Sequence, residues 1–244
     1  MTKKIGIIGF GNMGMVIGER LKPYSAKYQL VVFDKDSKKT EKISGISVAK
    51  NNLDILANVE TVILAIKPQD FDATLNEIKG NVKNKLIISI AAGISTDYIE
   101  KILDEARVVR VMPNVPARIG KGISCLCKGK FASEDDLNYA QEIFIYLGET
   151  MVLPESLMDA ATAISGSGPG YFYDLLETRC IGSADIQELE KFALEYFIPH
   201  MTAAAKEAGF SEEQAKMLAA ITAEGSVALL KSTKLLPKEL VLQV

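Results

Sequence analysis

Residues 4–21 read KIGIIGFGNMGMVIGERL, and this stretch carries the strongest structural signal in the chain. Its first five residues are typical of a short buried strand, and the residues from Met15 onward are typical of a helix. Between them lies the pattern G-x-G-x-x-G, made by Gly9, Phe10, Gly11, Asn12, Met13 and Gly14. Gly9 permits the tight turn, Gly11 lets backbone approach a pyrophosphate, and Gly14 lets the helix pack closely on the strand. The pattern predicts dinucleotide binding; the alternative is an ordinary strand-to-helix turn with incidental glycines.

A second predicted strand supports the dinucleotide interpretation. Residues 29–34 read QLVVFD and end in an acid, Asp34, at the distance from the turn where a ribose hydroxyl is bound. Asp34 favours a free 2′-hydroxyl and therefore NADH, whereas Lys35, Lys38 and Lys39 could accept the 2′-phosphate of NADPH. The predicted cofactor is NADPH or NADH, with a slight preference for NADH because of Asp34.

Composition argues against several classes of function. The chain has 244 residues and a net charge of −3, so no basic surplus indicates nucleic acid or anionic lipid as a partner. No apolar run approaches the roughly 20 residues of a membrane span, and we expect a cytoplasmic protein. Cys125, Cys127 and Cys180 lack paired metal-ligand spacing, so we expect reduced, buried thiols and no metal site. The lone histidine, His200, argues against hydrolase mechanisms that depend on a catalytic histidine.

The pattern of elements changes along the chain from alternating to helical. Strands are predicted at residues 4–8, 29–34, 59–66, 85–91, 108–112, 123–127 and 150–153. Helices are predicted at residues 15–21, 70–78, 95–103 with Ser95 as N-cap, 133–147, 158–163, 171–178, 185–197, 201–208 and 212–231. The predicted fold class is α/β, with a Rossmann-type parallel sheet domain at residues 1–155 and an all-helical domain at residues 156–244.

Four further blocks carry a family resemblance: AIKPQ at residues 65–69, SIAAGI at 89–94, VRVMPNVPA at 109–117 and TAISGSGPGY at 162–171. Together, behind a dinucleotide-binding turn, they resemble pyrroline-5-carboxylate reductase. The resemblance covers residues 4–175 and resumes near Ala203. It implies that a reduced nicotinamide delivers hydride to a cyclic imine carbon to make proline, and that the helical domain forms a homodimer or higher homo-oligomer.

The resemblance also implies site residues. The nicotinamide end of the cofactor is expected beside residues that follow strands, namely Ala65, Ile66, Lys67, Pro68, Ala91, Ala92 and Asn114. Lys67, Asn114, Ser165 and Ser167 are the candidate catalytic residues. Ala91 and Ala92 leave room for a flat ring, and Asn114 can present a side-chain amide.

The chain departs from the family pattern in two places. A Ser-x-Gly-Gly-Thr-Thr-like loop, which the resemblance implies for holding the substrate carboxylate, should begin where the sequence stops at Val244. About twenty extra residues lie between Thr178 and Pro199. We expect this 244-residue chain to bind cofactor but to reduce pyrroline-5-carboxylate poorly without that loop. Two alternatives stay open: a reductase of another imine or of a keto or hydroxy acid, and a catalytically impaired dinucleotide-binding paralogue.

Overall fold

The computed structural model describes residues 2–179, 186–233 and 235–244. The described chain divides into two compact units, which interleave along the sequence. The first unit comprises Met1–Val111 and Leu126–Tyr146, and the second comprises Met112–Cys125 and Leu147–Val244.

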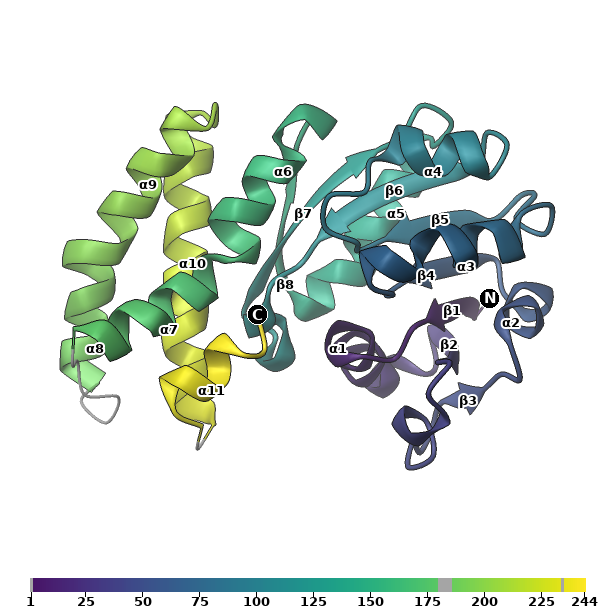
Figure 1. Cartoon of the computed structure of the whole chain (residues 1–244), viewed down its shortest axis with the longest axis horizontal. Helices are drawn as coiled ribbons and strands as arrows, with labels where there is room; N and C mark the ends of the chain where they lie inside the picture. The colour runs from purple at the N-terminus through teal and green to yellow at the C-terminus, as the bar shows by residue number, and fades with distance from the viewer. Residues whose placement is uncertain (1, 180–185, 234) are drawn as a thin grey trace. The chain divides into compact units, whose positions relative to one another are not determined.

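Eight strands of the described residues form one sheet in the order β3-β2-β1-β4-β5-β6-β7-β8 (Figure 1). They are β1 (Lys3–Ile8), β2 (Tyr28–Phe33), β3 (Ser47–Val48), β4 (Thr61–Leu64), β5 (Leu86–Ser89), β6 (Arg107–Met112), β7 (Gly122–Lys128) and β8 (Gly148–Val152). The pairs from β3 to β6 are all parallel. The central strands are apolar on both faces: Ile5 and Ile7 of β1, like Val62 and Ile63 of β4, have no exposed surface. Strands covered on both faces are typical of parallel sheets, so the predicted Rossmann-type sheet is confirmed.

Helices alternate with these strands in the first unit. They are α1 (Asn12–Leu21), α2 (Asn52–Asn58), α3 (Phe71–Ile78), α4 (Thr96–Ile102) and α5 (Glu134–Phe144). The predicted N-cap Ser95 accepts a hydrogen bond from the backbone N–H of Tyr98, and Ser133 forms a capping box with Asp136 at the start of α5. Side chains of α2, α3 and α4 join a core cluster with β1, β4 and β5 that includes Leu56, Leu75 and Ile99.

The second unit is mainly helical. Its helices are α6 (Met158–Ala161), α7 (Gly168–Thr178), α8 (Ile186–Phe192), α9 (Ile198–Glu207), α10 (Glu212–Ser232) and α11 (Pro237–Val241), with π-helical turns at Thr162–Gly166 and Ala193–Phe197. A core cluster forms around Phe172, whose ring meets those of Tyr173, Phe192 and Phe197. The long helix α10 lies beside α9 (Figure 1) and is capped by Ser211 and Gln214. The predicted helical C-terminal region is thereby confirmed for the described residues.

Several elements were not predicted from the sequence. The short strand β3 and helix α2 fall in a region that had no assignment, and α11 was missed as well. Helices were predicted at residues 185–197 and 201–208. In the structure residues 186–207 form one continuous helical run, because the π-helical turn Ala193–Phe197 joins α8 directly to α9, which contains Pro199. Cys180 and Asp185 lie outside the described residues.

Candidate functional site

The glycine-rich turn between β1 and α1 has the geometry that its sequence predicts. Gly9 has φ +92°, and a Cβ there would lie 2.5 Å from the carbonyl oxygen of Ala65. A Cβ on Gly14 would lie 2.2 Å from the carbonyl oxygen of Gly9. By contrast, a Cβ on Gly11 would meet no atom within 4 Å. Gly9 and Gly14 are therefore required by the fold, whereas the open space beside Gly11 is free for a ligand.

The N-terminus of α1 is open to an anion. Gly11 is its N-cap, with φ −75° and ψ −162°, and no side chain caps the first turn. No acidic residue lies in that first turn. Free backbone N–H groups and the helix dipole favour a negatively charged group here, such as a pyrophosphate.

Asp34, at the end of β2, connects this turn to the neighbouring strand. Its carboxylate accepts hydrogen bonds from the backbone N–H of Phe10 at 2.7 Å and of Asp36 at 2.9 Å. The ammonium of Lys39 lies 3.2 Å from both carboxylate oxygens. Burial alone would raise the pKa of Asp34, but the backbone donors and Lys39 outweigh it and hold the pKa below its usual value. Asp34 is thus a charged, nearly buried group whose oxygens already have donors.

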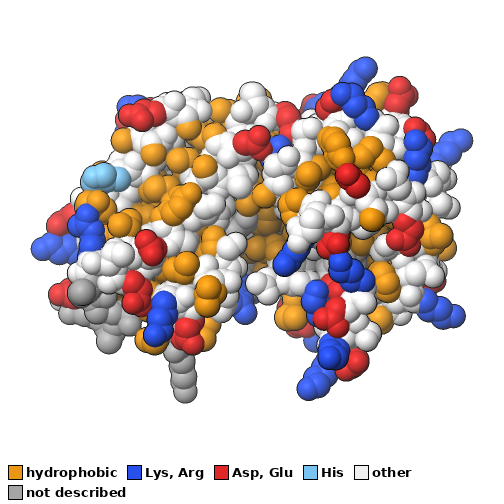
Figure 2. Space-filling model, viewed as in Figure 1, with side chains coloured by type: hydrophobic (Ala, Val, Ile, Leu, Met, Phe, Trp, Pro, Cys, Tyr) orange, Lys and Arg blue, Asp and Glu red, His pale blue; other side chains and the backbone are white. Residues whose placement is uncertain are grey.

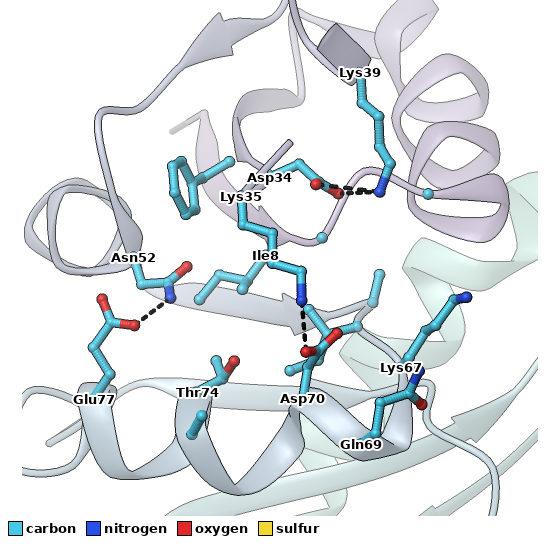
Figure 3. Close-up of a pocket in the computed structure, with 16 residues that line it drawn as sticks. Ile8, Asp34, Lys35, Lys39, Asn52, Lys67, Gln69, Asp70, Thr74 and Glu77 are labelled. Atoms are coloured by element: carbon cyan, nitrogen blue, oxygen red, sulfur yellow. Dashed lines mark hydrogen bonds and ion pairs between the residues drawn. The ribbon is translucent and has the colours of Figure 1, made fainter. Parts of the chain in front are cut away.

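A cavity of about 650 Å³ opens beside Asp34, entirely within the first unit (Figure 3). It is lined by Ile8, Gly9, Gly11, Phe33, Asp34, Lys35, Lys39, Asn52, Ala65, Ile66, Lys67, Gln69, Asp70, Ala73, Thr74 and Glu77. The carboxyl ends of β1, β2 and β4 meet at this edge of the sheet, which is where parallel sheets bind ligands. Its size suits a substantial part of a dinucleotide.

Two ion pairs join charged residues that line the cavity. Lys39 pairs with Asp34, and the ammonium of Lys35 lies 2.6 Å from Asp70, at the entry to α3 (Figure 3). The Lys35 side chain is 73% exposed, so it can move readily when a ligand enters. Both cations could turn toward a phosphate.

Asn52, the first residue of α2, was missed by the sequence analysis. It is 7% exposed, and its Nδ2 donates a hydrogen bond to Oε2 of Glu77 at 2.8 Å. Its Oδ1 is buried without a hydrogen-bond partner among the described residues. The sequence did carry one signal for this helix. Asn51 caps α2 with its side chain, and an Asn followed by a short apolar helical pattern is typical of a helix start.

The second unit holds the remaining candidates. The buried Asn114 donates from Nδ2 to the carbonyl oxygen of Ser165 at 3.1 Å, and its Oδ1 accepts from the backbone N–H of Ile123 at 3.0 Å. Ser165 is fully buried in a π-helical turn and donates to the carbonyl oxygen of Ala161. Ser167 precedes α7 and makes no cap hydrogen bond with its side chain. The structure therefore brings Asn114 and Ser165 together, and leaves one N–H of the Asn114 amide for another acceptor.

The cysteines behave as buried thiols where the structure describes them. Cys125 and Cys127 are buried, and neither is in a disulfide. Burial raises the pKa of the Cys125 thiol to about 12, although the nearby Ser165 hydroxyl opposes this. A thiol with so high a pKa is not a nucleophile at neutral pH. Within residues 2–179, 186–233 and 235–244, no group of His, Cys, Asp and Glu could hold a metal ion.

The predicted cofactor residues divide into two groups in the first unit. Gly9, Gly11, Asp34, Lys35, Ala65, Ile66 and Lys67 line the cavity. Phe10, Asn12, Met13, Gly14, Pro68, Ala91 and Ala92 do not. Phe10 is buried under Gly18 and contributes its backbone N–H to Asp34, while Pro68 begins a 3₁₀ turn that leads into α3.

A parallel sheet with an open glycine-rich turn and an acid after its second strand defines a dinucleotide-binding protein of the Rossmann class. Residues 4–93 match the family model described as NADP oxidoreductase coenzyme F420-dependent. A pyrroline-5-carboxylate reductase of Aquifex aeolicus is 32% identical over 247 residues, covering 100% of this chain and 84% of the relative. One of Haemophilus influenzae is 36% identical over 211 residues, covering 84% of this chain and 78% of the relative.

Solved structures agree with these sequence matches. The pyrroline carboxylate reductase of Plasmodium falciparum with NADP bound aligns with a TM-score of 0.65 at 27% identity, covering 98% of this chain and 82% of that one. The chain belongs to the pyrroline-5-carboxylate reductase family, an assignment that rests on relatives matched over most of both lengths. A reductive aminase of Aspergillus terreus at 16% identity shares the fold alone.

Proposed function

We propose that this chain reduces 1-pyrroline-5-carboxylate to L-proline with NAD(P)H. Membership of the reductase family carries the proposal, and the open turn at Gly11 beside a 650 Å³ cavity supports it. The bound cofactor supplies a hydride to the imine carbon, while the imine nitrogen takes a proton. The residues of this chain must hold the pyrophosphate, orient the substrate imine and exclude water.

We assign the cofactor contacts by their position in the first unit. The turn of Gly9, Phe10, Gly11, Asn12, Met13 and Gly14 holds the pyrophosphate, and Asp34 and Lys35 lie at the adenosine ribose. Ala65, Ile66, Lys67, Pro68, Ala91, Ala92 and Asn114 are proposed for the nicotinamide end, and Lys67, Asn114, Ser165 and Ser167 for the substrate. Asn114 would contact the cofactor or substrate through the second N–H of its side-chain amide. Its Oδ1 and its other N–H already form hydrogen bonds with Ile123 and Ser165.

The contacts of Asp34 favour NADPH over NADH, against the slight preference predicted from its sequence position. A ribose 2′-hydroxyl needs a carboxylate with a free acceptor site, but Asp34 already accepts from Phe10, Asp36 and Lys39. Lys39 neutralises the charge that would repel a 2′-phosphate, and Lys35 can leave Asp70 to meet it. The local charges therefore suit a phosphorylated ribose.

The test of this cofactor preference is kcat/KM with each reduced cofactor. We expect NADPH to be preferred, and a Lys39→Met variant to lose at least about tenfold in that preference because the cation beside Asp34 is gone. Lys38→Met, on the same 3₁₀ turn but outside the cavity, is the matched control. An unchanged ratio in Lys39→Met would remove Lys39 from the proposed phosphate site.

The activity itself is tested by oxidation of NADPH with 1-pyrroline-5-carboxylate as substrate. Proline must appear in equal amount to the cofactor consumed. Turnover of other cyclic imines or of keto acids at equal or greater kcat/KM would favour the alternative of a related reductase. Cofactor binding without any turnover would favour an impaired paralogue.

We further propose an assembly and a location. The helical residues 156–244 are proposed to form a homodimer or higher homo-oligomer, with residues 1–155 binding the cofactor. Light scattering after size-exclusion chromatography measures this directly, and a monomer at micromolar concentration contradicts it. A cytoplasmic location suits buried cysteines that form no disulfide and a reduced nicotinamide cofactor. None of the described helices is both long and apolar enough to span a membrane.

A further inference from the structure

We infer that Glu77 sets which purine base the cofactor site accepts, by fixing the orientation of the Asn52 side-chain amide. This inference rests on the proposed use of NADPH. It concerns the polarity of one hydrogen bond in the cavity beside Asp34. Glu77 is a positioning residue here, because it acts through Asn52.

The contact between the two side chains has only one possible polarity. An ionised carboxylate accepts hydrogen bonds and donates none. The amide of Asn52 must therefore turn its Nδ2 toward Glu77, which lies 2.8 Å away on α3. Its Oδ1 then faces away from Glu77, as Figure 3 shows.

The Oδ1 atom lacks the donor that a buried carbonyl oxygen requires. It is one of the few buried side-chain polar atoms of the described residues with no hydrogen-bond partner. A buried acceptor without a donor is unfavourable, so a donor that reaches it adds to binding. Because Asn52 lines the cavity beside Asp34, a bound ligand with a donor group can satisfy this oxygen.

The position of Asp34 and the order of the strands assign the adenine base to this oxygen. Asp34 marks the adenosine ribose at the end of β2, and the base is bonded directly to that ribose. Asn52 begins α2, which follows β3, the strand paired with β2 on the side away from β1. The exocyclic amino group of adenine is a donor, so it matches Oδ1 of Asn52. In hypoxanthine a carbonyl oxygen replaces that amino group, and two acceptors would then face each other.

The experiment compares NADPH with deamino-NADPH, in which hypoxanthine replaces adenine. Dissociation constants are measured by calorimetry on the full chain. For the natural chain we expect deamino-NADPH to bind about tenfold more weakly. In Glu77→Gln the new amide can donate to Asn52, so the Asn52 amide can reverse. We expect the ratio of the two constants to fall to about two or less.

A double variant separates this role from simple structural damage. In Asn52→Asp combined with Glu77→Gln, residue 77 donates and residue 52 is acceptor-only on both oxygens, so the preference for adenine should return to about tenfold. Asp72→Asn removes the same charge from α3, outside the cavity, and should leave the ratio unchanged. Thermal melts confirm that each variant is folded.

The outcomes separate the inference from the proposed function. If the natural chain binds NADPH but shows no preference over deamino-NADPH, the inference is overturned while the proposed function stands. An unchanged preference in folded Glu77→Gln also overturns it. Failure of the natural chain to bind NADPH at all contradicts the proposed function itself.

Discussion

Gly11 offers the cleanest single-residue test of the pyrophosphate site. Because a Cβ at this position meets no atom within 4 Å and the backbone is extended, Gly11→Ala should leave the fold and its stability unchanged. The added methyl group occupies the space where pyrophosphate approaches backbone, so we expect NADPH affinity to fall at least about tenfold by calorimetry. Gly9→Ala is the contrasting variant, since φ +92° and the contact with Ala65 should lower the melting temperature as well. Undiminished affinity in folded Gly11→Ala would contradict the assignment.

Asp34 should make stability depend on pH in a defined direction. Its pKa in the folded chain lies below the ordinary 3.8, so it binds protons less readily when folded. The stabilisation is therefore complete above the ordinary value and is lost as the pH falls through the lower folded-state value. Asp34→Asn should be about 1 to 2 kcal/mol less stable than the natural chain at neutral pH, and the difference should shrink below about pH 4. Urea unfolding at several pH values measures this, and a difference that is constant with pH would contradict it.

Asn114 joins three segments of the second unit by hydrogen bonds from one buried side chain. It follows β6 and binds both the start of β7 and the π-helical turn before α7. Asn114→Ala leaves two buried partners unsatisfied, so we expect a loss of about 2 to 4 kcal/mol in the free energy of unfolding. Asn114→Asp keeps the acceptor for Ile123 but buries a carboxylate against the carbonyl oxygen of Ser165, and should lose at least as much. If both variants are as stable as the natural chain, this structural role is wrong, and kcat/KM then tests the catalytic role alone.

Helix α10 approaches the 3₁₀ turn Val115–Ile119 closely enough to require glycine. A Cβ on Gly225 would lie 2.3 Å from the carbonyl oxygen of Lys121 and 2.9 Å from Cβ of Pro116. Neither backbone can yield easily, so Gly225→Ala should cost about 3 kcal/mol of stability, although alanine favours helix. Ser226→Ala, its neighbour on α10, should cost only about 1 kcal/mol for one lost hydrogen bond. Equal chemical denaturation midpoints for the two variants would contradict the close approach.

Elements with strong local signals were predictable, and those defined by distant contacts were not. The pattern KIGIIGFGNMG specifies a strand, a turn and a helix start within eleven residues, and the structure has all three. Helix α2 has only seven residues and β3 has two, so their periodicity is too short to detect. Asn52 was missed for that reason. Its importance depends on Glu77, which lies on another helix, and no local pattern encodes such a pairing.

At the scale of the whole molecule, the sequence predicted which residues lie near the glycine-rich turn, but not which hydrogen bonds those residues make. Asp34 was expected to favour NADH because its position matches a ribose acceptor. Its three donors come from Phe10, Asp36 and Lys39, and only the folded geometry shows that they occupy the carboxylate. The distribution of surface charge does not locate the cofactor site, since basic and acidic side chains are interspersed on the face seen in Figure 2.

The interleaved units predict how the chain responds to truncation. The chain passes between them near Met112, Leu126 and Leu147, so the sequence boundary predicted at residue 155 does not coincide with these crossings. A fragment of residues 1–155 keeps the cavity but loses Ser165 and α10, which contact Asn114, Pro116 and Lys121. We expect this fragment to bind NADPH weakly, while amide hydrogens of residues 113–125 exchange at least about a hundredfold faster than in the full chain. Hydrogen exchange resolved by mass spectrometry measures both regions. If residues 113–125 stay as protected in the fragment as in the full chain, their contacts with the helices contribute little, and the first 155 residues form a domain by themselves.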